Sequence, residues 1–182
     1  MTQENPDSSP YSGQQLGTFQ TLLDIVEKLR SPGGCPWDIE QTHSSLKRNL
    51  LEECYEVLEA IDGGGGKALS EELGDLLVQV AFHASIASHA GDFELADVLT
   101  HINRKLVRRH PHVFGDTQVL DAREVERNWE RIKAAERRDA GKGGNDAKKS
   151  PLDGIPKDLP ALTFAQLMQD RVGLAGFEWE DI

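Results

Sequence analysis

Apolar residues recur at spacings of three and four along most of this chain, and this helical period constrains the fold more than any other feature. It is clearest in residues 19–29, where the apolar positions are Phe19, Leu22, Leu23, Val26 and Leu29. Similar patterns predict helices at residues 42–62, 68–89, 95–109, 122–138 and 161–172. No segment shows sustained alternation of apolar and polar residues, so no sheet is expected. The sequence therefore predicts an all-α fold, an antiparallel bundle of four to five helices with short connections.

Composition divides the chain into a helical region and its flanks. Residues 1–16 are rich in Ser, Gln, Gly, Asn and Pro and are expected to form a disordered tail. Residues 17–138 hold the main helical domain. Residues 139–157, rich in Gly, Lys, Asp and Pro, are expected to be a linker. Residues 158–182 contain one further short helical pattern.

The overall charge and the cysteine content exclude several classes of protein. The net charge of −11 argues against binding to a nucleic acid polymer, which requires a basic surface. The two cysteines, Cys35 and Cys54, cannot form a disulfide framework. The first residues lack the basic and apolar regions of a signal peptide, and no apolar run approaches the roughly 20 residues of a membrane span. We therefore expect a cytoplasmic protein with no membrane or nucleic acid partner.

Two acidic pairs lie on consecutive predicted helices. Glu53 and Glu56 are separated by three residues, as are Glu72 and Asp75, and this spacing places each pair on one helix face. Four glycines at 63–66 lie between the helices and would allow the chain to reverse. The two pairs would then face each other across an antiparallel hairpin.

Four converging carboxylates repel one another and require a counter-charge to stay ionised. A hard divalent cation supplies it, and oxygen ligands favour Mg²⁺, with Mn²⁺ as an alternative. A solvated acidic face would show the same pattern, so the residues alone leave both interpretations open. Gly74 lies within the second acidic segment, and we expect its missing side chain to permit close approach of the helices.

Basic and aromatic residues form a second group further along the chain. Lys105 and Arg109 share a face at the end of a predicted helix, where they either complement the helix dipole or bind phosphate. Trp129, four residues before Lys133, either stacks on a base or packs in the core. Trp37 lies in a loop rich in Gly and Pro, which favours a ligand contact or a lid.

Several separated motifs, taken in order and spacing, resemble the MazG family of all-α nucleoside triphosphate pyrophosphohydrolases. The resemblance extends from about residue 17 to residue 138. The motifs that carry it are Gly34-Cys35-Pro36-Trp37-Asp38, Glu52-Glu53-x-x-Glu56, Glu72-x-x-Asp75, Arg108-Arg109-His110-Pro111-His112-Val113-Phe114 and Trp129-Glu130-x-x-Lys133.

The resemblance implies hydrolysis of nucleoside triphosphates (NTP or dNTP) to the monophosphate and pyrophosphate, in cleansing or regulation of the nucleotide pool. It implies that the four carboxylates Glu53, Glu56, Glu72 and Asp75 hold Mg²⁺. It places Lys105 and Arg109 on the triphosphate, and it implies that Trp129 and Lys133 complete the nucleotide pocket, with Trp37 as a further contact. A free carboxylate, Glu52 or a ligand such as Glu53, would accept a proton from the attacking water. Lys105 and Arg109 would stabilise the departing pyrophosphate.

Members of the family are usually dimers or higher oligomers, so we expect a homodimer or a dimer of dimers that completes the bundle. Gly176-Phe177-Glu178-Trp179 resembles the entry to a second MazG domain, and residues 158–182 are therefore expected to begin a repeat that this sequence does not continue. The alternative function is a non-catalytic helical module that senses nucleotides or binds a partner.

Overall fold

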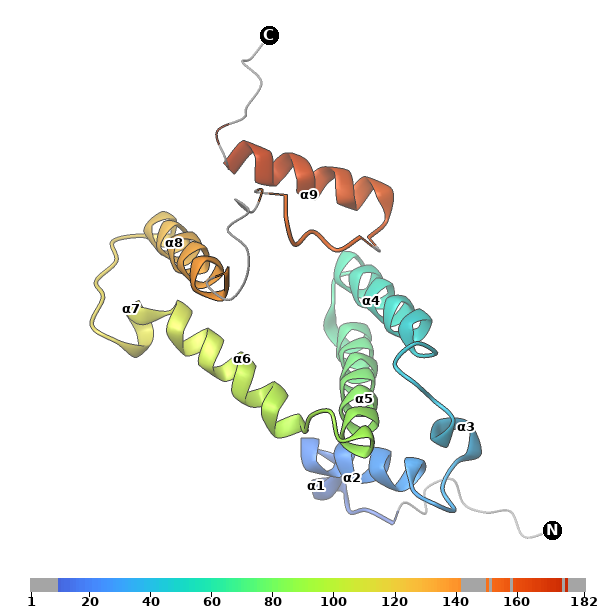
Figure 1. Cartoon of the computed structure of the whole chain (residues 1–182). Coiled ribbons are helices and arrows are strands. Elements are labelled where there is room, and N and C mark those ends of the chain that lie inside the picture. The colour runs from blue at the N-terminus through green and yellow to red at the C-terminus, as the bar shows by residue number, and fades with distance from the viewer. Residues whose placement is uncertain (1–9, 142–149, 151, 158, 175, 177–182) are drawn as a thin grey trace, which may run out of the picture. The chain divides into compact units, whose positions relative to one another are not determined.

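The computed structural model describes residues 10–141, 150, 152–157, 159–174 and 176. That part of the chain is helical and contains no strand, which confirms the all-α prediction (Figure 1). Every predicted helix is present, and three short ones are added. The helices are α1 (Gly13–Leu16), α2 (Phe19–Arg30), α3 (Pro36–Ile39), α4 (Lys47–Asp62), α5 (Gly66–Ala90), α6 (Leu95–Arg109), α7 (Pro111–Phe114), α8 (Ala122–Gly141) and α9 (Ala161–Leu174).

Helices α4 and α5 form an antiparallel hairpin and contact each other (Figure 1). The chain reverses through the glycine run, where Gly64, Gly65 and Gly66 have φ angles of 97°, 74° and 66°. These positive values are favourable for glycine and costly for residues with a side chain. The glycines therefore fix the hairpin that brings the two acidic helices together, as the sequence predicted.

Helix α2 packs against the C-terminal half of α5 and supplies the apolar core of this region. Val26, Leu46, Ala81 and Phe82 are buried together at 1–6% exposure. The surrounding half-buried side chains are Leu22, Leu23, Val78 and Ile86. Because α5 contacts α2 near its end and α4 near its start, it is the element that links the core to the acidic region.

Two helix starts differ from the prediction for local reasons. Helix α4 was expected from residue 42 but begins at Lys47, because Thr42 and Ser45 form a turn in which each side chain accepts from the other's backbone N–H. Helix α1 lies inside the range expected to be a tail. Its Ser12 and Gln15 form a capping box that stabilises a single helical turn.

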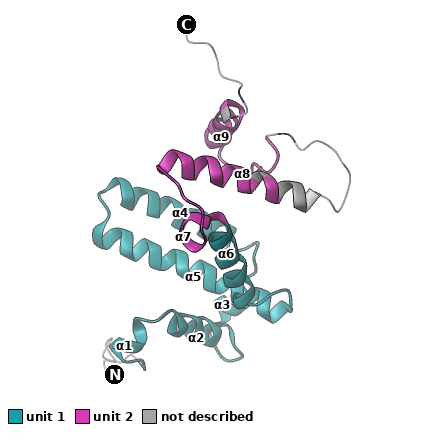
Figure 2. Ribbon diagram, turned by 90° about the vertical axis from the view of Figure 1, so that its left-hand side faces the viewer, with its two compact units in different colours: residues 1–108 teal, residues 109–182 magenta. Residues whose placement is uncertain are grey.

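The chain divides into two compact units, residues 1–108 and residues 109–182 (Figure 2). The division falls within α6 and not at either end of the expected domain, 17–138. The first unit holds the α4–α5 hairpin and the core, and the second holds α7, α8 and α9. Residues 142–149 of the expected linker and residues 177–182 of the expected second repeat lie outside the described residues.

No helix in the described ranges combines the length and the apolar character that crossing a membrane requires.

Candidate functional site

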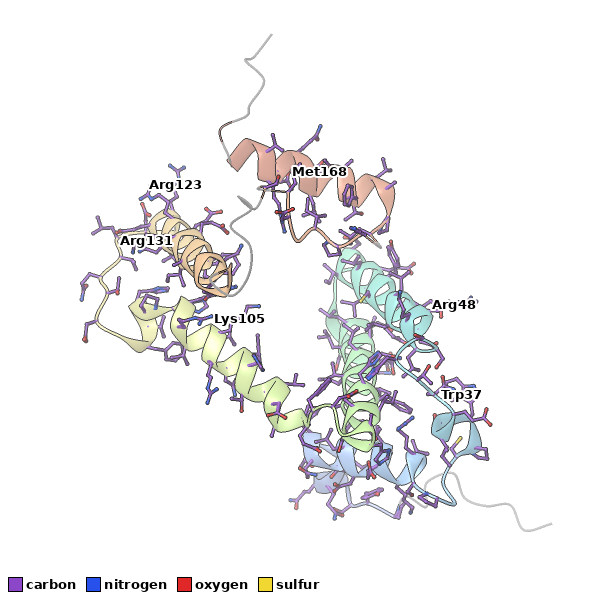
Figure 3. The ribbon with its side chains drawn as sticks, viewed as in Figure 1. Trp37, Arg48, Lys105, Arg123, Arg131 and Met168 are labelled. Atoms are coloured by element: carbon purple, nitrogen blue, oxygen red, sulfur yellow. The ribbon has the colours of Figure 1, made fainter. Side chains whose placement is uncertain are left out.

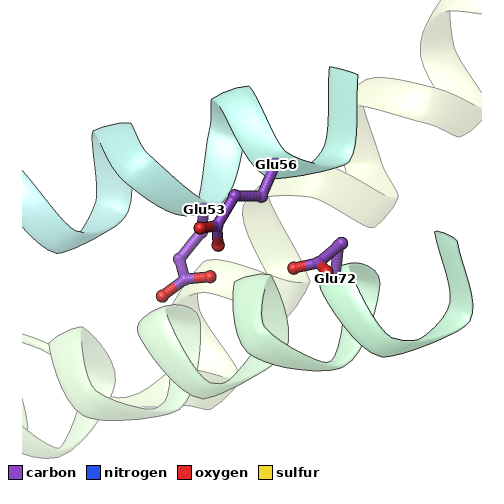
Figure 4. A group of neighbouring side chains, drawn as sticks. All are labelled: Glu53, Glu56 and Glu72. Atoms are coloured by element: carbon purple, nitrogen blue, oxygen red, sulfur yellow. The ribbon is translucent and has the colours of Figure 1, made fainter. Parts of the chain in front are cut away.

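Carboxylates from α4 and α5 meet on the inner side of the hairpin. Glu53 and Glu56 of α4 and Glu72 of α5 each offer an oxygen atom, and these atoms all lie within 4.8 Å of one another (Figure 4). The three side chains project from their helices into the same space (Figure 4). Three carboxylate oxygens this close match the donor set of a hard divalent cation such as Mg²⁺ or Mn²⁺.

Desolvation and repulsion between the carboxylates of this group shift the pKa values of two of them. The pKa of Glu53 is raised by partial burial and then by the negative charges of Asp75, Glu56 and Glu72. The pKa of Glu72 is likewise raised, first by desolvation and then by the charges of Glu56 and Asp75. Both shifts mean that the ionised form is disfavoured as long as no cation is nearby. A divalent cation would relieve this repulsion.

The fourth predicted ligand, Asp75, is exposed and lies outside the tight group of three, yet its charge acts on both Glu53 and Glu72. Glu52 also lies outside it, and its Oε1 accepts a hydrogen bond from Arg48 Nε at 2.9 Å. The expected role of Gly74 is wrong. A Cβ added there would meet nothing within 4 Å, because the helices do not approach closely at this position.

The second unit brings four charged groups around one tryptophan. Arg109 lies 5.5 Å from the centre of the Trp129 ring and Lys133 lies 4.4 Å from it, both in the range of cation–π contact. Arg109 also donates from Nη2 and Nε to Glu136 at 2.7 and 3.3 Å, and Lys133 pairs with Glu130 at 2.7 Å. The structure therefore gathers Arg109, Trp129 and Lys133, as predicted, but surrounds them with acidic partners.

Two predicted contacts lie on exposed positions. Trp37 is on α3 and is 59% exposed, and Lys105 is exposed on α6 (Figure 3). Sequence analysis expected Trp37 in a loop, but it lies in the short helix α3, which Arg30 holds by donating from Nη1 to the Asp38 carbonyl at 2.6 Å. Exposed side chains on fixed backbone are suited to contact with a ligand, and both assignments remain predictions.

Sequence analysis missed several polar residues that the structure places beside the predicted ones. Glu136 follows Trp129 by seven residues, about two helical turns, so it lies on the same face of α8. His43 and His83 stack with ring centres 5.0 Å apart and a contact of 2.7 Å between their Nδ1 atoms. Because these histidines are 40 residues apart, no local sequence pattern predicts that they contact each other.

Taken together, the fold and the carboxylates define an all-helical protein with a candidate divalent-cation centre on a helical hairpin. Residues 41–114, which span the whole hairpin, match the family model of the MazG nucleotide pyrophosphohydrolase domain. This match shows that the chain contains a MazG nucleotide pyrophosphohydrolase domain.

Known relatives agree with this assignment. The chain is 48% identical to the nucleoside triphosphate pyrophosphohydrolase/pyrophosphatase MazG of Thermotoga maritima over 90% of its own length. It is 46% identical to the nucleoside triphosphate pyrophosphohydrolase of Escherichia coli K12, again over 90% of its length. It spans 60% of each of these relatives. The crystal structure of a mazG-related protein from Thermotoga maritima aligns with 63% of this chain and 98% of that chain, at 28% identity and a TM-score of 0.54.

Proposed function

We propose that this chain hydrolyses nucleoside triphosphates, NTP or dNTP, to the monophosphate and pyrophosphate in a Mg²⁺-dependent reaction. The observation that carries the proposal is the group of carboxylates that α4 and α5 bring within 4.8 Å of one another. The names of the relatives from Thermotoga maritima and Escherichia coli support the same reaction. The role we assign to it is cleansing or regulation of the nucleotide pool.

The carboxylates of α4 and α5 are suitable ligands for a divalent cation. Glu53, Glu56 and Glu72 would hold it, with Asp75 adjacent, and all four offer oxygen atoms, the donors that Mg²⁺ prefers. A bound Mg²⁺ would neutralise phosphate oxygens and lower the pKa of the attacking water.

The remaining chemistry falls to the side chains of the chain itself. A carboxylate must take the proton of the attacking water, and Glu53, which lies within the group of carboxylates, is one candidate. Glu52 is the alternative acceptor, after it leaves Arg48. Lys105 and Arg109 would bind the triphosphate and stabilise the charge on the departing pyrophosphate. Arg109 would have to exchange Glu136 for phosphate to do so.

The test is an assay of the products formed from a panel of NTPs and dNTPs, with and without Mg²⁺. Anion-exchange chromatography separates monophosphate and pyrophosphate from diphosphate and orthophosphate. We expect the first pair, and only when Mg²⁺ or Mn²⁺ is present. Formation of orthophosphate alone, in the absence of a pyrophosphatase, would assign a different reaction.

A second candidate function is supported by the acidic partners of the basic residues. Arg109 and Lys133 are neutralised by Glu136 and Glu130, as expected if this group serves folding or nucleotide sensing and not turnover. A non-catalytic module would bind nucleotides, measured by calorimetry, without releasing pyrophosphate. Turnover in the product assay would exclude this alternative.

We further propose that the protein assembles as a homodimer or a dimer of dimers. Large apolar side chains remain exposed on α4, α5 and α6, each between 37% and 54% exposed: Leu51, Leu58, Ile61, Leu73, Leu77, Val80, Val98, Leu99, Ile102 and Val107. Large exposed apolar side chains in this number are typical of protein interfaces, and most soluble oligomers are symmetric assemblies of one chain. Light scattering at micromolar concentration tests the proposal, which an active monomer would refute.

A further inference from the structure

Four polar residues of α5 form one stripe along the helix. Glu72, Asp75, Gln79 and His83 follow one another at spacings of three and four, which keeps them on one face. At one end of the stripe, Glu72 meets the carboxylates of α4. At the other end, His83 contacts His43, four residues before the start of α4. Gln79 lies between these two contacts and is therefore on the side of α5 that faces α4.

Gln79 is unusual among the polar residues of the hairpin because it is buried without a partner. Its side chain is only 7% exposed, and its Oε1 has no hydrogen-bond partner among the described residues. One turn further along, the Nε2 atom of His83 is also buried and unpartnered. The large majority of buried side-chain polar atoms are hydrogen-bonded in proteins, so each exception calls for a partner that the chain itself does not supply.

The chemistry of Oε1 restricts what Gln79 can bind. An amide oxygen accepts hydrogen bonds, so it selects a ligand group that carries an O–H or N–H. Ionised phosphate oxygens carry no such hydrogen, so they cannot satisfy Oε1. The O–H and N–H groups of a nucleoside triphosphate lie on its sugar and its base. Gln79 is four residues beyond Asp75, about 6 Å along the helix axis, which places it beside the carboxylates but outside them.

We propose that Gln79 recognises the nucleoside part of the substrate. Its Oε1 accepts a hydrogen bond from a sugar hydroxyl or a base N–H while the phosphates lie at the α4 and α5 carboxylates. This inference rests on the proposed function, since it takes the same nucleotide in the same site. It makes Gln79 a residue for affinity and specificity that leaves the bond-breaking step to other groups.

The experiment compares two ligands that share the phosphates and differ in the nucleoside. Binding of ATP and of inorganic tripolyphosphate, each with Mg²⁺, is measured by calorimetry for the unmodified protein and for Gln79→Met. Methionine is similar in size to glutamine and has no strong hydrogen-bonding group. Gln20→Met, at an exposed glutamine of α2, is the matched control. Thermal unfolding verifies that each variant is folded.

We expect Gln79→Met to weaken ATP binding about tenfold, the effect of one lost hydrogen bond, and to change tripolyphosphate binding less than twofold. Gln79→Leu also lacks a hydrogen-bonding group and should show the same selective loss of ATP binding, which serves if the methionine variant does not fold. Comparing ATP with dATP then tests the 2′-hydroxyl of the sugar as the donor, because the two nucleotides differ only at that group.

Equal weakening of both ligands would overturn the inference, because Gln79 would then act through the carboxylates. Unchanged binding of both ligands by Gln79→Met would also overturn it and would leave Gln79 a purely structural residue. Pyrophosphate release by the unmodified protein tests the proposed function separately. A protein that binds ATP selectively through Gln79 without turnover would refute hydrolysis and support the inference.

Discussion

The burial and contact distances of the ion pair between Arg109 and Glu136 predict how much the pair stabilises the protein. The two side chains are 14% and 18% exposed and are joined by contacts of 2.7 and 3.3 Å. Exposed pairs contribute about 0–1 kcal/mol, while breaking a fully buried pair costs about 3–5 kcal/mol. For this partly buried pair we expect a coupling energy of about 1–3 kcal/mol. In a chain of 182 residues, the loss of this coupling energy lowers the melting temperature by about 2–12 °C.

The assay is a double-mutant cycle of Arg109→Ala and Glu136→Ala, followed by urea unfolding. Arg131→Ala is the control on α8, the helix that carries Glu136. Arg131 is exposed and its Nη2 donates to Asn128, so its loss should cost less than about 0.5 kcal/mol. A coupling energy below about 0.5 kcal/mol would refute the reasoning, because the pair would then behave as a solvated surface contact.

The same variants separate the two roles of Arg109 in activity. If Arg109 also binds the triphosphate, Arg109→Ala lowers kcat/KM about ten- to two-hundredfold, the range for one charge-assisted contact. Glu136→Gln then frees Arg109 and should tighten triphosphate binding while it lowers stability. Unchanged kcat/KM in Arg109→Ala together with a lower melting temperature would restrict Arg109 to a structural role.

Further predictions concern the carboxylates and α5. Glu53→Gln and Asp75→Asn should each nearly abolish turnover while the fold is retained, as circular dichroism and product assays would show; near-normal turnover in both would exclude the metal assignment. The pKa values of Glu53 and Glu72 are raised in the folded protein, so the folded chain binds more protons and its metal-free stability should fall as the pH rises through those pKa values. Mg²⁺ should accordingly raise the melting temperature more at pH 7.5 than at pH 5, and equal shifts would contradict this. The pKa of His83 is lowered by burial and by His43, so the unfolded chain binds more protons, and stability should fall as the pH drops below about 6.5. His83→Asn should flatten that decline in urea unfolding. Gly74→Ala should stabilise the protein by about 0.5–1 kcal/mol, because its Cβ would meet open space; destabilisation would reveal a close contact.

Local patterns were sufficient to predict the helices and the acidic pairs. The spacing of apolar residues indicates the helices, and the glycine run marks the reversal between α4 and α5. An antiparallel hairpin with this turn leaves Glu53 and Glu56 facing Glu72, so the candidate cation site was already defined by spacing. Helix starts were less predictable, because Thr42 and Ser45 close a turn whose hydrogen bonds compete with helix formation.

The tertiary structure decided which charges meet partners and which polar atoms are buried. Sequence spacing put Arg109 on a helix end but could not show that Glu136 of another helix neutralises it. Gly74 lies in the acidic segment, but the sequence could not show that a Cβ at this position would meet open space. The burial of Gln79 and the stacking of His43 on His83 depend on how α5 packs against the chain around α4. Helical period and turns depend on neighbours within a few residues, whereas burial and ion pairing depend on side chains that only folding brings together.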